Sequence, residues 1–306
     1  MGQYKDFLDI TDRTREEILA TLDLAVRMKS EQMSGRGSRP LEGKTLAMVF
    51  QKPSARTRVS FEVGMYQLGG DALYLSPSDI GLGEREAVKD VAQVLARYND
   101  GIMARVFSHS HILELAEYAS VPVINGLSDL LHPCQVMADL LTIWEHKGKV
   151  EGLKIAFVGD GNNLANSWLN AASRLDFTLA LAIPETYEPD RQIFERAKSA
   201  NAGVTISEVP EHAVEDADVI YTDTWTSMGQ EEEAEARRRD FQGFTVDEAM
   251  VSKASKDVIV MHCLPAHRGE EITDEVMDGP HSVVFDEAEN RLHAQKAILV
   301  ELMGEA

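Results

Sequence analysis

The sequence has 306 residues with 44% hydrophobic content, a length that can bury a large core and that predicts two domains. Its 30 basic and 51 acidic side chains give a formal net charge of −21, which argues against nucleic-acid binding and requires a local arginine cluster for any anionic ligand. No apolar run approaches the ~20 residues that cross a membrane, and the first residues lack the apolar core of a signal peptide, so a cytoplasmic protein is expected.

The chain opens with an amphipathic helix predicted at residues 11–30, in which Thr14 and Glu17 lie near a capping position. A polar, glycine-rich loop at residues 34–43 follows, and then an apolar run at residues 45–50 that is typical of a buried strand. The strand leads into a second helix with two sets of apolar residues: Val59, Val63 and Tyr66 at helical spacing, with Phe61, Met65 and Leu68 beside them.

The turn between this strand and helix, Phe50 to Arg58, contains two arginines and two hydroxyl groups. A helix N-terminus presents unpaired N–H groups and the positive end of the dipole, and a guanidinium group binds phosphate oxygens in a bidentate manner. The turn therefore predicts an anion site with phosphate as the expected ligand, while an exposed basic turn is the alternative.

The rest of the first half alternates strands and helices, the pattern of a parallel sheet. Strands are predicted at 72–75, 102–107 and 121–124, and helices at 86–98, at 110–119 and from His132 to about Lys147. Arg105 lies inside the apolar strand at 102–107, where an arginine is costly unless it is paired, so a functional role is favoured over a solvated edge.

A second β/α series follows, with strands predicted at 154–158, 218–222 and 258–261 and a last helix at about 289–303. Its first turn, Gly159 to Leu164, lies where a dinucleotide fingerprint would begin, and Glu185 follows the next strand as an acidic ribose ligand would. Leu164 replaces the third glycine of that fingerprint. Two interpretations stay open: nicotinamide binding, or a turn that presents Asn163 to a small polar ligand.

Two polar clusters in this half follow strands directly, at Asp223 and at His262 to Pro265. Parallel-sheet enzymes bind ligands at the carboxyl ends of strands, which favours a functional role for both clusters. The charged stretch from Glu231 to Asp240 is expected to form a mobile surface loop or a short helix. Arg291 is expected in the first turn of the last helix, where a cation opposes the dipole, and either a ligand or a salt bridge would explain it.

No nucleophile triad or metal-ligand spacing appears in the sequence. His262, Cys263 and His267 resemble ligands but lack a fourth partner, and Cys134 and Cys263 form no C-x-x-C pair, so no metal and no cofactor is expected. What remains is positioning and electrostatic catalysis between two small substrates, one phosphorylated and one carrying amine and carboxylate groups.

Four motifs in order resemble the ornithine carbamoyltransferases over nearly the whole chain: Ser54-Ala55-Arg56-Thr57-Arg58, His132-Pro133-Cys134-Gln135, Asp223 with Ser227-Met228-Gly229, and His262-Cys263-Leu264-Pro265. The resemblance implies two α/β domains, each a parallel sheet flanked by helices, with the C-terminal helix returning to the first. It implies a carbamoyl-phosphate-binding domain of residues 1–132 plus 289–306, an ornithine-binding domain of residues 133–288, and a homotrimer or a multiple of trimers.

Carried onto matching positions, the resemblance assigns carbamoyl phosphate to Ser54, Ala55, Arg56, Thr57, Arg105, His132, Gln135, Leu264 and Arg291. It assigns L-ornithine to Asn163, Asp223, Ser227, Met228 and Cys263. Of these, Arg56, Arg105, His132 and Cys263 are the expected catalytic residues. The implied reaction is attack of the neutral δ-amine of ornithine on the carbamoyl carbon, giving citrulline and phosphate in arginine metabolism.

Two positions depart from the family pattern. Ala55 replaces a usual threonine, which leaves the backbone N–H in place. Gly81 replaces a glutamine that reaches carbamoyl phosphate in the neighbouring subunit, so Arg85 or another polar residue of that loop takes over the contact, or the donor site is weaker. Other readings are a carbamoyltransferase for putrescine or another amine, an aspartate-using relative, a non-catalytic family member and a nicotinamide-dependent oxidoreductase.

Arginine outnumbers lysine 18 to 12. An acidic, lysine-poor surface suits a high-salt cytosol, in which self-repulsion is screened, and an ordinary acidic enzyme is the alternative.

Overall fold

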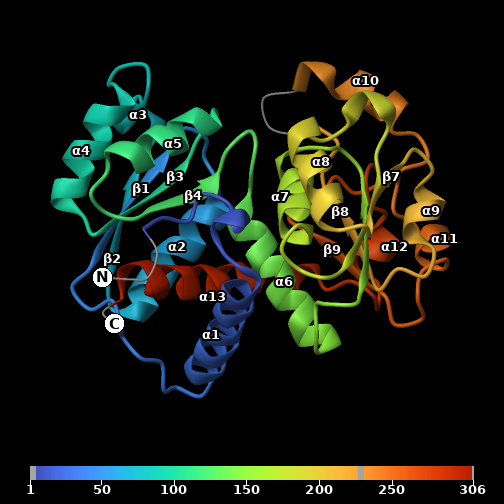
Figure 1. Ribbon diagram of the computed structural model, residues 1–306, viewed down its shortest axis with the longest axis horizontal. Coiled ribbons are helices and arrows are strands. Elements are labelled where there is room, and N and C mark those ends of the chain that lie inside the picture. Colours follow the sequence, from blue (N-terminus) through green and yellow to red (C-terminus); the bar gives the residue numbers. More distant parts are fainter. Residues whose placement is uncertain (1–4, 227–230, 305–306) are drawn as a thin grey trace. The chain divides into compact units, whose positions relative to one another are not determined.

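The computed structural model describes residues 5–226 and 231–304, and the chain divides into two compact units (Figure 1). Unit 1 comprises Met1–Leu141 with Asn290–Ala306, and unit 2 comprises Thr142–Glu289. Within the described ranges, no helix combines the length and the apolar character that crossing a membrane requires. The two-unit α/β architecture agrees with the predicted fold class.

Unit 1 is built on a four-stranded parallel sheet in the order β2-β1-β3-β4. The strands are β1 (Thr45–Phe50), β2 (Asp71–Leu75), β3 (Gly101–Arg105) and β4 (Val123–Leu127). The helical elements are η1 (Ile10–Asp12), α1 (Arg15–Met33), α2 (Ala55–Leu68), α3 (Pro77–Ile80), α4 (Val88–Tyr98), α5 (His109–Tyr118), part of α6 (Pro133–Lys147) and part of α13 (Val284–Met303). Strands β1 and β3 are central and almost wholly buried, as their continuous apolar sequences require.

Strand β3 ends two residues earlier than its sequence indicates. The predicted strand ran to Phe107, but the register between β3 and β4 shifts between Ala104 and Arg105. The last residue pairs of β3 follow this irregularity and join Arg105 to Leu127 of β4 and to Phe50 of β1, so the Arg105 side chain lies at the carboxyl end of a central strand.

Helix α2 buries the second of its two apolar sets. Phe61, Met65 and Leu68 are at most 1% exposed, whereas Val59 is 53% and Tyr66 is 79% exposed. The buried face also carries a glycine, Gly64, and a Cβ there would contact Lys296 and Leu292 of α13 at 3.4 and 3.6 Å. Packing against α13 therefore selects the face.

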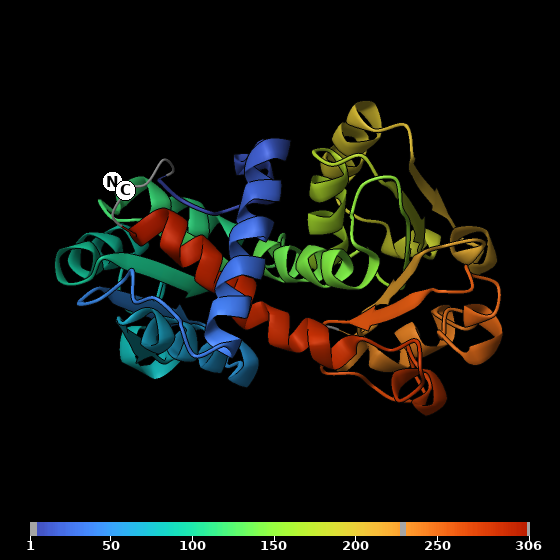
Figure 2. The same cartoon turned by 90° about the horizontal axis from the view of Figure 1, so that it is seen from below.

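Helix α1 crosses the unit 1 part of α13 (Figure 2). Thr21 donates to Glu301 at 2.7 Å, and Lys29 donates to Asn290 at 2.8 Å. The start of α1 confirms the predicted cap, because Thr14 and Glu17 form a capping box there.

Unit 2 is built on a five-stranded parallel sheet in the order β7-β6-β5-β8-β9. The strands are β5 (Lys154–Val158), β6 (Thr178–Ala182), β7 (Val204–Ser207), β8 (Val219–Thr222) and β9 (Ile259–His262). The helical elements are the end of α6, α7 (Asn163–Ala172), η2 (Glu185–Tyr187), α8 (Arg191–Ala200), α9 (Pro210–Val214), η3 (Glu231–Glu233), α10 (Ala234–Asp240), α11 (Glu248–Val251), α12 (Asp274–Met277) and the start of α13. The chain leaves β5 toward β6 on one side and returns to β8 on the other, which makes the carboxyl ends of β5 and β8 the topological switch point.

The last helix, α13, begins at Val284, five residues before the predicted start. Arg291 therefore lies two turns inside the helix, and the prediction that it opposes the dipole in the first turn is wrong. The predicted apolar alignment of Ala294, Ile298 and Leu302 is confirmed, because all three are buried.

Candidate functional site

The predicted anion turn forms the N-terminus of α2. Ser54 is the N-cap, and its Oγ accepts the Thr57 N–H at 3.3 Å, while the two hydroxyl oxygens lie 3.1 Å apart. Arg56 and Ala55 are exposed in the first turn, whereas Thr57 is fully buried. The turn combines a helix N-terminus with an accessible guanidinium, and this combination binds oxyanions.

Arg291 ties this turn to α6. It is 4% exposed, and it donates from Nη1 to Gln135 Oε1 at 2.9 Å and from Nη2 to Thr57 Oγ1 at 3.0 Å. Gln135 in turn donates from Nε2 to Asp139 at 2.7 Å, which fixes the orientation of its amide. Three helices of unit 1 thus hold one buried positive charge beside the N-terminus of α2.

His132, immediately before α6, lies within the field of three arginines. Burial and then the positive charges of Arg291, Arg105 and Arg56 hold the pKa of His132 well below its ordinary value. The imidazole is therefore neutral at pH 7. The structure brings these four predicted residues together in unit 1, and the cluster suits a ligand with two negative charges.

Cys134 is not a nucleophile. It is buried, its Sγ donates to the Asn125 carbonyl at 3.4 Å, and burial raises the pKa of the thiol to about 12.

The predicted polar residues of unit 2 gather at the carboxyl ends of β8 and β9. Asp223 is 8% exposed, and its Oδ1 accepts the Cys263 Sγ–H at 3.0 Å and the Thr224 N–H at 2.8 Å. Its Oδ2 accepts from Asn162 Nδ2 at 2.8 Å. The carboxylate is thus held by residues that follow β5, β8 and β9.

Asn162 belongs to this cluster through its hydrogen bond to Asp223, although the sequence predicts its neighbour Asn163 as the site residue. Asn162 caps α7, its Oδ1 accepting the N–H groups of Leu164 and Ala165 at 2.9 and 3.2 Å. An asparagine directly before an apolar helix is a recognisable N-cap signal. Asn163 is the first residue of that helix, at the switch point of the sheet.

Leu264 has an unusual backbone, with φ at +59° and a cis bond to Pro265. Its N–H donates to His262 Nδ1 at 2.9 Å. The imidazole of the preceding strand therefore holds the segment from which the Leu264 carbonyl projects. Ser227 and Met228, also predicted as ligand residues, lie outside the described residues.

The charged stretch after them contains η3 and the short helix α10, so the short-helix alternative is correct. Its Arg237 is buried, with 5% of the residue exposed, and donates to Asp160 Oδ2 at 3.0 Å and to the Trp225 carbonyl at 2.7 Å. Arg237 lowers the pKa of Asp160, but burial of the carboxyl has the larger effect and raises that pKa to about 7. Arg237 thus fastens α10 to the ends of β5 and β8.

The turn that follows β5 is closed by the chain itself. In dinucleotide sites the second glycine lets a pyrophosphate approach the backbone. Here the Gly161 N–H donates to the Tyr187 carbonyl at 2.9 Å, and a Cβ on Gly161 would lie 2.4 Å from the Pro189 nitrogen. Because residues 187–189 occupy that space, the geometry argues against the nicotinamide alternative.

The local backbone conformation explains why residue 81 is a glycine. It ends α3 in the left-handed region, with φ at +59°, and a Cβ there would lie 2.9 Å from Arg85 Cβ. A glutamine at this position would be strained. Arg85 itself donates to the carbonyls of Ser78 and Asp79 in the same loop.

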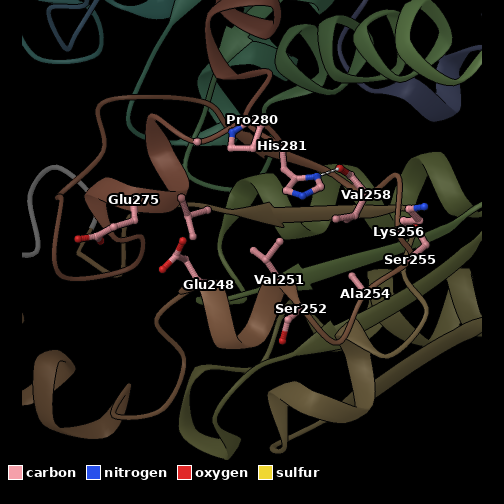
Figure 3. A pocket seen from close by; sticks show the side chains of 12 residues that line it. Glu248, Val251, Ser252, Ala254, Ser255, Lys256, Val258, Glu275, Pro280 and His281 are labelled. Carbon is pink, nitrogen blue, oxygen red and sulfur yellow. Dashed lines mark hydrogen bonds between the residues drawn. The ribbon is translucent and has the colours of Figure 1, made fainter.

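A separate cavity of about 310 Å³ opens elsewhere in unit 2 (Figure 3). It is lined by residues near α11 and α12, among them Glu248, Val251 and His281. His281 turns its Nδ1 to the Val258 carbonyl at 2.8 Å. None of the predicted site residues lines this cavity.

One unit carries an arginine cluster at a helix N-terminus, and the other carries a carboxylate and a thiol at strand ends. These features define an α/β enzyme of two parallel-sheet units that handles small polar molecules. The carbamoyl-P binding domain of aspartate/ornithine carbamoyltransferase matches residues 5–145, and the Asp/Orn binding domain matches residues 151–302. The chain belongs to the aspartate/ornithine carbamoyltransferase family, which confirms the resemblance read from its motifs.

Individual relatives are similar over their whole lengths. The ornithine carbamoyltransferase of Syntrophus aciditrophicus is 58% identical over 296 residues, 96% of this chain and 98% of the relative. That of Thermococcus kodakarensis is 56% identical, covering 98% of this chain and 96% of the relative. The solved ornithine carbamoyltransferase of Pyrococcus furiosus superposes with a TM-score of 0.96 at 53% identity, covering 100% and 99% of the two chains.

Proposed function

We propose that this enzyme transfers the carbamoyl group of carbamoyl phosphate to the side-chain amine of L-ornithine, giving citrulline and phosphate. The observation that carries the proposal is the cluster of Arg56, Arg105, Arg291 and neutral His132 in unit 1. The matched carbamoyl-P binding domain spans this cluster apart from Arg291, and relatives named ornithine carbamoyltransferase are 53–58% identical to the chain.

The donor end of the proposed site is the N-terminus of α2. The phosphate accepts hydrogen bonds from Ser54, Arg56 and Thr57 and from the N–H groups around Ala55. Arg105 bridges the phosphate and the carbamoyl oxygen, and the rest of the carbamoyl group is bound by the remaining donor-site residues, His132, Gln135, Leu264 through its carbonyl, and Arg291. The arginine cluster of unit 1 offsets the repulsion that a chain of charge −21 exerts on a dianion.

The acceptor end is the strand-end cluster of unit 2. Asp223 and Asn163 bind the α-amino and carboxylate groups of ornithine together with Ser227 and Met228, and Cys263 lies beside the side-chain amine. Asp223 is held by Asn162, Thr224 and Cys263, so its carboxylate is oriented before a cationic ligand arrives.

The chemistry needs no covalent intermediate. The neutral δ-amine attacks the carbamoyl carbon, and Arg105 and His132 donate hydrogen bonds to the oxygen on which negative charge develops. The tetrahedral intermediate then collapses as its carbon–oxygen bond to the phosphate breaks. The attacking nitrogen gives up its proton to the departing phosphate, whose remaining charge is compensated by Arg56 and the helix dipole. A preorganised donor of this kind contributes about 3 kcal/mol to the transition state.

The proposal includes the domain assignment predicted from sequence, with carbamoyl phosphate on residues 1–132 plus 289–306 and ornithine on residues 133–288. It includes a cytoplasmic location and a homotrimer. Exposed apolar side chains on α2 and on the neighbouring edge strand β2 support association with further copies: Val59, Val63, Tyr66 and Leu73, between 37% and 79% exposed.

The test is phosphate release from carbamoyl phosphate with ornithine, putrescine, N-acetylornithine and aspartate as separate acceptors, at low and at molar salt. Ornithine-dependent release with citrulline formed is the expected result. Preference for another amine would overturn the acceptor assignment and leave the donor site standing. No turnover with any acceptor at either salt concentration would reopen the non-catalytic reading.

A further inference from the structure

The two carboxylate oxygens of Glu271 differ in their hydrogen bonds. The residue is fully buried, and its Oε1 is bonded to His262 Nε2 at 2.9 Å and accepts the His267 N–H at 2.6 Å. Its Oε2 is equally inaccessible, and among the described residues no donor lies within hydrogen-bond distance of it. A buried carboxylate oxygen without a partner is costly, and an ion or a water molecule is the usual explanation.

Two further potential ligands lie beside this carboxylate. His267 Nδ1 lies 3.8 Å from Glu271 Oε2, and His267, Glu270 and Glu271 each offer one ligand atom such that the three atoms lie within 4.8 Å of one another. Two ligands of a tetrahedral ion stand about 3.4 Å apart when each is 2.0–2.1 Å from the metal. Small rotations of the exposed His267 and the partly exposed Glu270 side chains therefore bring the set to coordination distance.

We propose that His267, Glu270 and Glu271 form a divalent metal site of the Zn²⁺ class. One imidazole nitrogen and two carboxylate oxygens suit Zn²⁺ and Co²⁺, and solvent supplies the fourth ligand. The exposed edge of His267 gives the ion access, and a chain of charge −21 attracts cations. Of the three possible ligands that the sequence contains, His262, Cys263 and His267, the proposed site uses only His267.

Charged neighbours permit this assignment. Arg238 pairs with Glu270 Oε1 at 2.9 Å, but its side chain is 54% exposed, and the second oxygen of Glu270 remains for the ion. His262 is excluded from this set because both ring nitrogens are engaged, Nε2 by Glu271 and Nδ1 by the Leu264 N–H.

The site would act on the segment that carries Leu264. An ion on Oε2 fixes the Glu271 carboxylate, Oε1 then fixes the tautomer of His262, and His262 holds the Leu264 N–H. Metal binding would therefore stiffen residues 262–271 without touching substrate.

A competing group exists in the same unit. Asp223, His262 and Cys263 also offer ligand atoms within 4.8 Å of one another. The two groups differ chemically, since only the competitor contains sulfur. Co²⁺ bound to a thiolate shows a sulfur-to-cobalt charge-transfer band, and a nitrogen and oxygen set does not.

The experiment titrates the metal-free full-length protein with Co²⁺ and Zn²⁺, by calorimetry and, for Co²⁺, by absorption spectroscopy. The variants are His267→Ala and Glu270→Gln. The controls are Cys263→Ser, which removes the sulfur of the competitor, and His212→Ala, which removes an exposed histidine on α9. Far-ultraviolet circular dichroism verifies that each variant is folded.

The expected result is one ion bound per chain with no charge-transfer band. His267→Ala and Glu270→Gln should each weaken binding about tenfold or more, and the two controls should bind as the unaltered chain does. Binding that is lost in Cys263→Ser and accompanied by the charge-transfer band would overturn the proposal in favour of the competitor. Absence of binding, or equal binding by His267→Ala, would also overturn it and would assign a proton or a water molecule to Glu271 Oε2.

Discussion

Arg56 and Arg58 lie in the same turn of α2 but have different surroundings. Arg58 pairs with Glu62 at 2.9 Å and lies over the Tyr74 ring. Arg56 is exposed, and its positive charge contributes to the low pKa of His132. Of these two arginines, the proposed function assigns only Arg56 to the phosphate.

We therefore expect Arg56→Ala to lower turnover by a factor of about 100 to 1,000, equivalent to ~3 kcal/mol in the transition state. Its unfolding free energy should change by less than about 0.5 kcal/mol, because the side chain is exposed. Steady-state kinetics and urea denaturation measure the two effects. Arg58→Ala, the matched control, should keep its turnover, and wild-type kinetics in Arg56→Ala would refute the assignment.

His132 links the arginine cluster to the pH dependence of stability. The pKa of His132 is depressed in the native state. Below pH 6.5 the imidazole therefore binds a proton in the unfolded chain but stays neutral in the native chain. Stability is therefore lost as the pH falls from 6.5 toward the native pKa, by about 1.4 kcal/mol per pH unit for one group.

Urea denaturation between pH 8 and pH 5 tests this sign. The His132→Asn variant should lose less stability than the unaltered protein over the interval from pH 6.5 to pH 5. Parallel pH profiles for the two proteins would show that His132 is not held neutral.

At the scale of elements, Arg237 is the anchor of α10. Removing one partner of a buried ion pair costs about 3–5 kcal/mol, because the other charge stays buried. Arg237→Met should therefore lower the unfolding free energy by an amount that grows toward this value as the pH rises above about 7, the pKa of Asp160 in the intact pair, because the ion pair exists only where Asp160 is ionised.

A double-mutant cycle with Asp160→Asn distinguishes the ion pair from packing. The double variant should regain part of the loss, because no uncompensated carboxylate remains. Arg239→Met, an exposed arginine of the same helix, should have little effect. Equal losses in the single and double variants would show that Arg237 acts through its contact with the Tyr187 ring and not through its charge.

The sequence predicted the order of strands and helices because apolar runs alternate regularly with helical patterns. It did not predict which face of α2 is buried, because both faces carry apolar residues and the choice depends on α13, distant in sequence. The early start of α13 was missed as well. Its first turn carries Asp286 and Glu287, and buried Glu287 is stabilised by Tyr221 and by the His262 N–H, contacts that no local pattern contains.

The candidate site was accessible from sequence where its residues form short motifs. Asn162 and Arg237 were not selected, because their importance comes from partners on other strands. From the sequence, Gly81 predicts the loss of a side-chain contact to carbamoyl phosphate, whereas the structure shows that the loop requires a left-handed backbone at this position.

At the scale of the whole molecule, the exposed apolar face of α2 provides a test of the proposed trimer. Tyr66→Glu, at a residue that is 79% exposed in the single chain, should convert the proposed trimer to monomers by placing a charge in its subunit interface, at a cost of about 3 kcal/mol or more per copy. Sedimentation equilibrium should then give one third of the original mass. Val209→Glu, at an exposed residue of unit 2, should stay trimeric, and a trimeric Tyr66→Glu variant would place the interface elsewhere.

The closed turn at Gly161 limits what protein engineering can do with unit 2. Its sheet has the strand order of dinucleotide-binding domains, and replacing Leu164 by glycine would complete the sequence fingerprint of such domains. That change would not create a cofactor site, because the backbone of residues 187–189 occupies the space that a pyrophosphate needs. It would also leave a cavity where the Leu164 side chain is now buried. Recruiting this fold for redox chemistry would require shortening the segment after β6, a change of chain path that no single substitution supplies.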